Sequence, residues 1–239
     1  MLYMLIDMHA HSSGISTCCR IPAPEVIDAA AAAGIQGIIL TNHYNKSYVT
    51  DGDFNGFARR YVEEYRFAKA HGDEKGFPVL FGVEVQMELH DRVHMLVYGV
   101  EPQFVLKHPS LFDYSQEELY RLVKAEGGAM VQAHPLRRGK NVLLDPAYLD
   151  GVEINSHPLY DGSHLDELRA FATEHGLILT SGGDYHADTH RPCCGAVLPD
   201  GIKTTDVGAY LLKVESIELC YQEPHERTCR RTVFSRKCR

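Results

Sequence analysis

Short apolar runs alternate with helical patterns along most of the chain, and this alternation limits its possible folds more than any other feature. Apolar, β-branched runs that predict strands lie at 2–7, 35–41, 78–85, 93–100, 129–133, 152–155, 177–181 and 216–221. Helical spacing predicts helices at 24–34, 57–70, 115–127, 165–175 and 207–213. This order favours a parallel sheet with helices outside it. Roughly seven such strands suggest a closed barrel, so we expect an α/β fold of the TIM-barrel type.

The composition is that of a single globular domain. The chain has 239 residues and 44% of them are hydrophobic, which is enough for a substantial core. The formal net charge of −8 argues against stable nucleic-acid binding and against an anionic membrane partner. No apolar run is long enough to span a bilayer. The apolar start at 1–7 lacks the basic leader of a signal peptide, so we expect a cytoplasmic protein.

The last residues of the chain differ from the rest. Residues 224–239 are rich in arginine and poor in apolar side chains. We therefore expect the barrel to occupy residues 1–223, followed by a basic C-terminal tail over 224–239. The tail is either an extended closing arm or partly disordered.

The cysteines form a poor pattern for a disulfide framework. There are seven of them, and two pairs are adjacent in sequence, Cys18–Cys19 and Cys193–Cys194. Neither pair has the spaced arrangement of a zinc knuckle. Reduced thiols in a cytoplasm are the simpler interpretation.

Metal-binding residue types stand at the ends of most predicted strands. In chain order they are Asp7, His9, His11, His43, Glu84, His94, His134, Asn155, His157, Asp184 and His186. In a parallel barrel the C-terminal ends of all strands share one face. We therefore expect these side chains to converge in space although they are far apart in sequence.

The spacing of these residues suits metal binding. His9 and His11 are two apart, so on an extended strand their side chains point the same way. Asp184 and His186 repeat that spacing. Neutral imidazole and carboxylate suit zinc, manganese and iron. The two oxygens of Glu84 can bridge two ions, which together can clamp a phosphoester.

Each residue alone also has a purely structural interpretation. An isolated His-x-His is a weak signal, and Glu84 alone could pair with an arginine. His94 alone would be an ordinary half-buried strand residue, and His134 with Pro135 could form a turn. The recurrence of ligand-type residues at successive strand boundaries is what favours a metal site.

Five motifs carry a resemblance to a known family. They are DxHxH (7–11), TNH (41–43), GVE (82–84) with VHMLVYG (93–99), AHP (133–135) and GGDYH (182–186). In this order they resemble the PHP family, the polymerase and histidinol phosphatase-type metal-dependent phosphoesterases. The resemblance covers residues 5–200, and the motifs are specific only in combination.

The resemblance implies a distorted seven-stranded (β/α) barrel that holds two to three divalent ions of zinc, manganese or iron. It implies three ligand sets, which are His9, His11, Glu84 and Asp184 for the first ion, Glu84, His94 and His134 for the second, and His43 and His186 for the third. It also implies that Asp7 orients a ligand histidine, a common role for a carboxylate.

The chain departs from the family pattern at three places. Asn42 stands where the second motif usually has aspartate, and Gly183 stands where serine is frequent. The family often has a further His or Asp shortly after the first motif, but residues 12–18 contain none. Cys18 or water could substitute there, so the departure leaves open how the third site is filled.

Arginines and histidines near the motifs are candidates for substrate binding. Arg137 and Arg191 suit bidentate phosphate contacts, and His190 could support them. Asp7, His43 and His157 are the catalytic candidates. For each of them, a solvated loop charge or a structural polar residue is the alternative.

We expect hydrolysis of a small phosphomonoester, of the histidinol phosphate or nucleotide phosphate type, by attack of a metal-bound hydroxide. One alternative is a metal-dependent amidohydrolase, but related barrels of that class commonly use a carboxylated lysine, and no lysine ends a middle strand here. The other alternative is a non-catalytic metal-binding or partner-docking module of the same family. The sequence does not indicate the oligomeric state.

Overall fold

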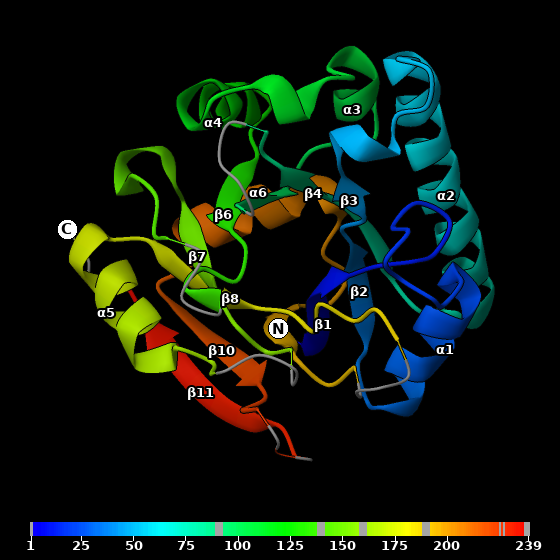
Figure 1. Ribbon diagram of the computed structural model, residues 1–239. Helices are drawn as coiled ribbons and strands as arrows, with labels where there is room; N and C mark the ends of the chain where they lie inside the picture. The colour runs from blue at the N-terminus through cyan, green and yellow to red at the C-terminus, as the bar shows by residue number, and fades with distance from the viewer. Residues whose placement is uncertain are drawn as a thin grey trace.

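A ring of seven strands forms the centre of the molecule (Figure 1). The computed structural model describes residues 2–88, 93–137, 142–157, 162–187, 192–224, 226 and 228–236. In sheet order the ring consists of β1 (Tyr3–Ala10), β2 (Gly37–Leu40), β4 (Val79–Gln86), β5 (His94–Tyr98), β6 (Ala129–Gln132), β7 (Gly151–Ile154) and β8 (Ile178–Ser181). A parallel bridge between Ala10 and Tyr185 joins the segment after β8 to β1. The predicted α/β barrel, a single domain, is therefore confirmed.

The strands of the ring are not all parallel. β5 runs antiparallel to both β4 and β6. Its direction relative to β4 follows from the connection between Gln86 and His94, which is too short for the helical crossover that parallel strands need. The pairing places His94, the first residue of β5, opposite Gln86 at the end of β4. The start of β5 therefore belongs to the same rim as the C-terminal ends of the other strands.

Among the described residues, four further strands lie outside the ring. β3 (His43–Tyr44) pairs with β4, and β9 (Gly195–Pro199) pairs antiparallel with β1. β10 (Ser216–Tyr221) follows β9, and β11 (Arg230–Ser235) pairs antiparallel with β10 along its whole length. Residues 230–235 of the predicted tail thus form an edge strand.

In the described part of the chain, six α-helices pack around the ring. They are α1 (Ala23–Ala32), α2 (Phe54–Lys75), α3 (Gln103–Lys107), α4 (Gln116–Ala125), α5 (Leu165–His175) and α6 (Thr204–Lys213). Ser115 and Glu118 form the predicted capping box of α4. The longest helix, α2, begins after Asp53, whose side chain accepts a hydrogen bond from the amide of Gly56. Among the described residues, no helix has the length and apolar character needed to cross a membrane.

Apolar side chains fill the ring and the layer between ring and helices. Ile6, Met8, Leu96 and Val131 are fully buried members of one continuous core. This packing fixes the strands that carry the rim residues, since core side chains at native density have little freedom to move.

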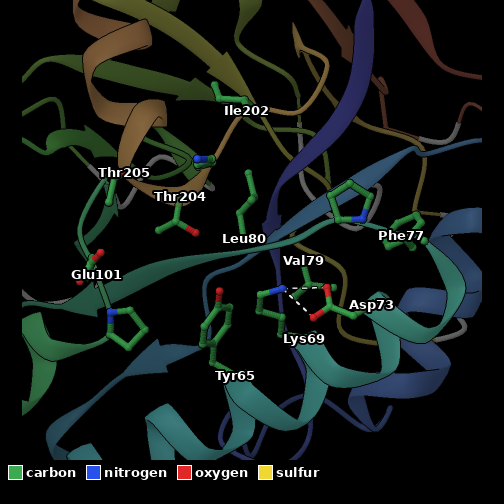
Figure 2. Close-up of a pocket in the computed structure, with 14 residues that line it drawn as sticks. Tyr65, Lys69, Asp73, Phe77, Val79, Leu80, Glu101, Ile202, Thr204 and Thr205 are labelled. Atoms are coloured by element: carbon green, nitrogen blue, oxygen red, sulfur yellow. Dashed lines mark hydrogen bonds and ion pairs between the residues drawn. The ribbon is translucent and has the colours of Figure 1, made fainter.

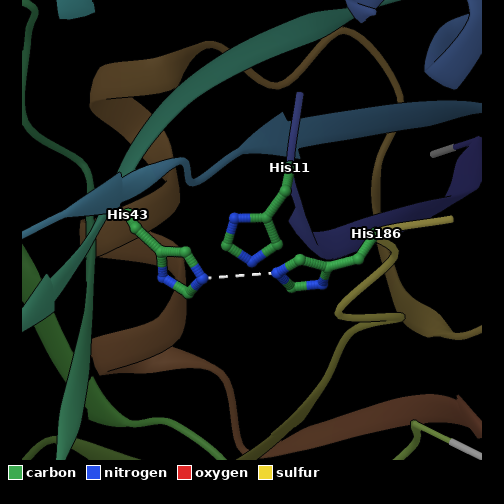
Figure 3. Close-up of side chains that lie close together, drawn as sticks. All are labelled: His11, His43 and His186. Atoms are coloured by element: carbon green, nitrogen blue, oxygen red, sulfur yellow. Dashed lines mark hydrogen bonds between the residues drawn. The ribbon is translucent and has the colours of Figure 1, made fainter. Parts of the chain in front are cut away.

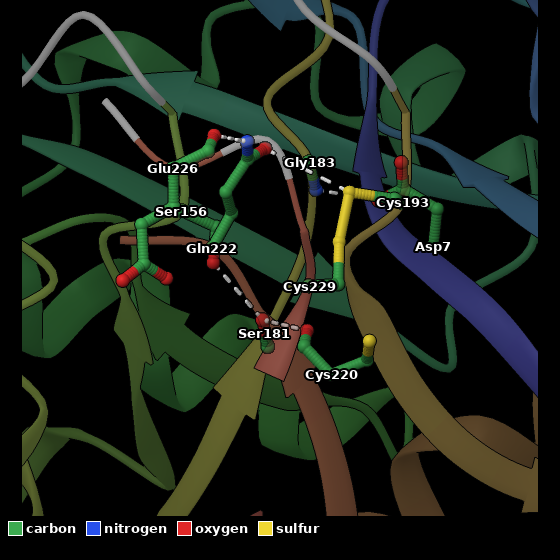
Figure 4. Close-up of a disulfide and its surroundings, with 9 residues drawn as sticks. All are labelled: Asp7, Ser156, Ser181, Gly183, Cys193, Cys220, Gln222, Glu226 and Cys229. Atoms are coloured by element: carbon green, nitrogen blue, oxygen red, sulfur yellow. Dashed lines mark hydrogen bonds between the residues drawn. A yellow bond between two sulfur atoms is a disulfide. The ribbon is translucent and has the colours of Figure 1, made fainter. Parts of the chain in front are cut away.

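One cysteine prediction is wrong. Cys193 and Cys229 form a disulfide (Figure 4), whereas reduced thiols were expected. The two residues are 36 apart in sequence, and their Cα atoms are 6.4 Å apart, which is within the usual range for disulfides. The antiparallel order β9–β10–β11 brings them together, and sequence spacing alone does not reveal such a pairing. The bridge joins the segment before β9 to the start of the C-terminal arm.

Candidate metal centre

Histidines and carboxylates from six segments of the chain meet at one rim of the barrel. Their ligand atoms form three overlapping groups, and within each group the atoms lie within 4.8 Å of one another. The groups are His9, His11 and Glu84; His43, Glu84 and His94; and His11, His43 and His186. Asp184 and His134 contact the same residues. The structure therefore brings together all eight predicted metal ligands.

Glu84 lies at the centre of this group and is fully buried. Its Oε1 atom is 2.8 Å from Nδ1 of His94, 3.1 Å from Nε2 of His134 and 3.3 Å from Nε2 of His9. Its Oε2 atom is 3.5 Å from Nε2 of His11. One carboxylate thus faces imidazoles on both sides, which is the arrangement a carboxylate needs to bridge two ions.

Asp184 faces the same space from the segment after β8. Its Oδ1 atom is 3.2 Å from Nε2 of His11 and 3.6 Å from Nε2 of His9. Its Oδ2 atom accepts a hydrogen bond from the guanidinium of Arg137. Asp184 therefore stands between the histidines of β1 and a cation at the mouth of the site.

Three imidazoles form the outer part of the centre (Figure 3). The rings of His43 and His186 lie on either side of His11, with centroids 4.3 and 4.2 Å from the His11 centroid. Nε2 of His43 and Nε2 of His186 face each other at 3.3 Å. These nitrogens converge on one point, as ligands of a single ion do.

The donor atoms fit a divalent cation. Several buried atoms of the centre have no hydrogen-bond partner among the described residues, namely Nε2 of His9, Nε2 of His11, Nδ1 of His43, Oε2 of Glu84 and Oδ1 of Asp184. A buried polar atom without a partner is costly. Nδ1 of His43 and Oε2 of Glu84 lie in close contact without hydrogen-bond geometry. Imidazole and carboxylate are the usual ligands of zinc, manganese and iron.

The two carboxylates are held in their anionic forms. Burial alone would raise the pKa of Asp184, but the positive charges of Arg137 and His9 hold it well below its usual range. Burial also opposes the ionisation of Glu84, and the surrounding imidazoles, His43 foremost, outweigh it and keep that pKa low. Deprotonated carboxylates are the form that binds metal.

Two imidazoles are held in their neutral forms. Burial, assisted by the charge of Arg137, lowers the pKa of His134 to about 3. Burial and the neighbouring His186 and His43 keep the pKa of His11 well below its usual value. Neutral imidazole has a lone pair for a metal ion, so both residues are in a ligand form.

Glu153, which the sequence patterns did not single out, orients a ligand histidine. Both of its carboxylate oxygens lie 3.0 Å from Nδ1 of His9, and one also accepts a hydrogen bond from the backbone amide of His134. Burial lowers the pKa of His9, but Glu153 and Glu84 outweigh it and raise that pKa well above its usual value. The only sequence signal is a lone carboxylate inside the apolar strand β7.

Asp7 bonds to backbone rather than to an imidazole. Its Oδ1 atom accepts hydrogen bonds from the amides of His9 and Gly183, at 2.9 and 2.8 Å. It ties β1 to the loop that carries Asp184 (Figure 4). A Cβ atom on Gly183 would lie 2.7 Å from Oδ2 of Asp7, so this tie accounts for glycine where the family often has serine. Burial raises the pKa of Asp7 to about 7.

Backbone strain also concentrates at the centre. His134 has a φ of 31° and Asp184 a φ of 49°, in the left-handed region that residues other than glycine rarely adopt. Such conformations persist where the surrounding structure enforces them, and they cluster at functional sites. In this conformation the side chain of His134 faces Glu84, and the side chain of Asp184 faces His11.

Asn42 has a clear role in place of the family's aspartate. Its Oδ1 atom accepts hydrogen bonds from the amide of Ser12 and the hydroxyl of Ser16, and its Nδ2 atom donates to the hydroxyl of Ser12. An aspartate could not make the last of these bonds because it has no donor when ionised. Asn42 thus fixes the loop that follows the first motif.

The predicted substrate residues are placed only in part. Arg137 lies at the mouth, against Asp184. His157 is buried, and its ring centroid is 6.5 Å from that of His186. Arg191 and His190 lie outside the described residues.

A cavity lies beside the first residues of β4, at the end of the strand opposite to Glu84 (Figure 2). It has a volume of about 600 Å³ and is lined by Val79 and Tyr65, among others. Two of its charged residues, Lys69 and Asp73, pair with each other, and Glu101 and Lys203 line it as well. None of the clustered histidines and carboxylates of the described chain lines it. The rim around Glu84 is therefore the candidate site, at the barrel face where such sites occur.

Comparison with known proteins shows a shared fold. No protein-family model and no curated protein matches the sequence. A protein proposed to be a metal-dependent phosphoesterase, from Bifidobacterium adolescentis, has a TM-score of 0.56 and 18% identity over 87% of this chain and 95% of its own. PsfC from Pseudomonas syringae has a TM-score of 0.60 and 17% identity over 85% of this chain and 86% of its own. An amidohydrolase from Chromobacterium violaceum, solved with sulfate and without metal, has a TM-score of 0.55 and 20% identity over 83% of this chain and 93% of its own. These neighbours fit the resemblance found in the motifs.

Proposed function

We propose that this chain is a metal-dependent phosphoesterase that hydrolyses a small phosphomonoester, of the histidinol phosphate or nucleotide phosphate type. The observation that carries the proposal is the group of buried, unpartnered imidazole and carboxylate atoms around Glu84. The guanidinium of Arg137 at the mouth adds a cation suited to phosphate. The fold shared with a proposed metal-dependent phosphoesterase supports the same class of reaction.

The positions of the side chains suggest how two or three ions would be held. His9, His11, Glu84 and Asp184 would hold the first, Glu84, His94 and His134 the second, and His43 and His186 the third. When bound, such ions lower the pKa of a water molecule and neutralise charge on the phosphoryl oxygens. Zinc, manganese and iron suit this set of nitrogen and oxygen donors.

The chain's own residues would supply orientation and proton transfer. Glu153 keeps the imidazole of His9 in one tautomer, with Nε2 turned toward Glu84 and Asp184. Arg137 would bind the non-bridging oxygens of the phosphate. His157, a buried residue whose ring lies beside that of His186, would donate a proton to the leaving alcohol.

An amidohydrolase is the second candidate, because one structural neighbour has that name. Amidohydrolases on related barrels commonly use a carboxylated lysine, but none of the lysine ion pairs of the described residues involves Glu84 or Asp184. A non-catalytic module is less well supported, since the full ligand set is present.

A substrate panel tests the proposal. The purified protein, loaded in turn with Mn²⁺, Zn²⁺ and Fe²⁺, would be assayed on phosphomonoesters, phosphodiesters, amides and lactones. Turnover of phosphomonoesters that is lost in Asp184→Ala, with the folded state retained, is the expected result. Turnover of amides or lactones alone would favour the amidohydrolase, and no turnover of any compound with any metal would favour the non-catalytic module.

A further inference from the structure

The loop after the first motif contains a thiol where the related pattern often has a histidine or aspartate. We propose that the Cys18 thiolate is a ligand of the outermost ion, which it holds together with His43 and His186, and that this position selects zinc. The inference rests on the metal centre proposed above but not on its phosphate chemistry.

The two histidines already have the spacing of zinc ligands. Nε2 of His43 and Nε2 of His186 are 3.3 Å apart. Two nitrogens that each lie about 2.0–2.1 Å from a tetrahedral zinc ion are about 3.3 Å apart, because the angle between them is about 109°. The fully buried Nε2 of His11 is turned into the same cluster and has no hydrogen-bond partner in the described chain (Figure 3).

Cys18 is a soft ligand in the loop that bonds to these histidines, between Ser16 and Arg20. Its neighbour Tyr48 lies edge-on to His43, with ring centroids 6.4 Å apart. Burial raises the pKa of the Cys18 thiol, but the imidazoles of His186 and His43 outweigh it and lower that pKa to about 6. The hydroxyl of Tyr48 lies 3.9 Å from Sγ of Cys18 and donates to it. A thiolate that ligates zinc commonly accepts such a bond from a neighbouring donor.

Hydrogen bonds on both sides of Cys18 fix the loop against the same histidines. The hydroxyl of Ser16 bonds to Nδ1 of His11 and accepts from the amide of His43. Two residues beyond Cys18, the amide of Arg20 donates to the carbonyl of His186 at 2.9 Å. The backbone around Cys18 is therefore docked onto the cluster, and the thiol position is set by the fold rather than by a free loop.

The chemistry of the donors differs between the inner and outer parts of the centre. Glu84 and Asp184 supply oxygen ligands to the inner part, which suit manganese and iron as well as zinc. A thiolate is a soft ligand and disfavours magnesium and manganese. Cys18 is exposed, so the outer ion would lie at the mouth and leave room for water or substrate as a further ligand.

Cobalt spectroscopy tests the proposal directly. The full chain would be loaded with Co²⁺, and near-ultraviolet thiolate-to-cobalt absorption would be recorded together with the number of ions per chain. We expect this band in the wild type and its complete loss in Cys18→Ser, with one ion fewer per chain. Cys19→Ser is the matched control, because the Cys19 thiol turns to the carbonyl of Ile21, and it should keep both the band and the ion.

Alkylation of the wild type provides a measurement that needs no variant. Zn²⁺ should slow the reaction of Cys18 with iodoacetamide at least tenfold, as followed by peptide mapping, while Mn²⁺ should not. A protein that binds Co²⁺ without the thiolate band, or whose Cys18 reacts equally fast with and without Zn²⁺, would overturn the role of Cys18 and leave the phosphoesterase proposal intact. A chain that binds no ion at all would overturn both.

Discussion

Both carboxylate oxygens of Glu153 lie 3.0 Å from Nδ1 of His9. This contact turns the other ring nitrogen of His9 toward Glu84 and Asp184, at 3.3 and 3.6 Å. A carboxylate behind a ligand histidine fixes both its ring orientation and its tautomer. Glu153 is thus a positioning residue for the metal centre.

Replacing Glu153 should weaken metal binding without removing a ligand. We expect Glu153→Ala to lower the affinity for the first ion by about 10–100-fold, measured by competition with a chelator. Glu153→Gln should retain part of the affinity, because its amide oxygen can still accept from Nδ1. The exposed Glu167 on α5 provides the control Glu167→Gln, which should change nothing. Equal affinities in all four proteins would contradict the assigned role.

Arg137 should act on phosphate rather than on folding. In Arg137→Ala we expect KM for a phosphomonoester to rise and inhibition by inorganic phosphate to weaken, each by about 10–100-fold. The reason is the loss of a charge-assisted hydrogen bond, which contributes about 1.5–3 kcal/mol. Arg137→Lys should restore little, because lysine lacks the bidentate fork. Arg121→Ala on α4, an exposed partner of Glu117, is the matched control. An unchanged phosphate inhibition constant would show that the guanidinium serves only Asp184.

His157 should matter most for poor leaving groups. If it protonates the leaving alcohol, His157→Gln should lower kcat for an alkyl phosphate by about 10²-fold or more. The same variant should hydrolyse p-nitrophenyl phosphate almost normally, since nitrophenolate needs no proton to leave. The comparison of kcat on the two substrates checks this, with His71→Gln on α2, which pairs with Asp28, as the control. Equal losses on both substrates would point to a structural role.

The disulfide should stabilise the fold. Cys193 and Cys229 close a loop with a sequence separation of 36, and a bridge of this kind contributes about 2–4 kcal/mol by restricting the unfolded chain. We expect Cys229→Ser to lower the free energy of unfolding in urea by about that amount. Reductant should destabilise the wild type equally and leave the variant unaffected. A wild type whose unfolding midpoint ignores reductant would mean that the bridge does not form in solution.

Much of the centre could be predicted from the sequence because its ligands follow a simple rule. His9, Glu84 and Asp184 each lie within three residues of the C-terminal end of an apolar strand, and strand ends meet at one rim. His94 lies at the same rim for a reason that the sequence patterns did not show. It begins β5, and only the antiparallel direction of that strand brings its start to the rim.

Other features could not be predicted because they depend on contacts between distant segments. Glu153 is a single carboxylate in an apolar strand, and only the fold shows that it faces His9. The Cys193–Cys229 pairing depends on the course of β9 to β11. The strand β9 was also missed, because the short run 195–199 ends in proline and has few β-branched residues.

The number of ions bound per chain tests the central claim most directly. Equilibrium dialysis against Mn²⁺ or Zn²⁺, followed by elemental analysis, should give at least two ions per wild-type chain, since the clusters around Glu84 share its carboxylate. Glu84→Gln should lose at least one of them, with its circular dichroism spectrum unchanged. A folded wild-type protein that retains no divalent ion at concentrations well above micromolar would contradict the account.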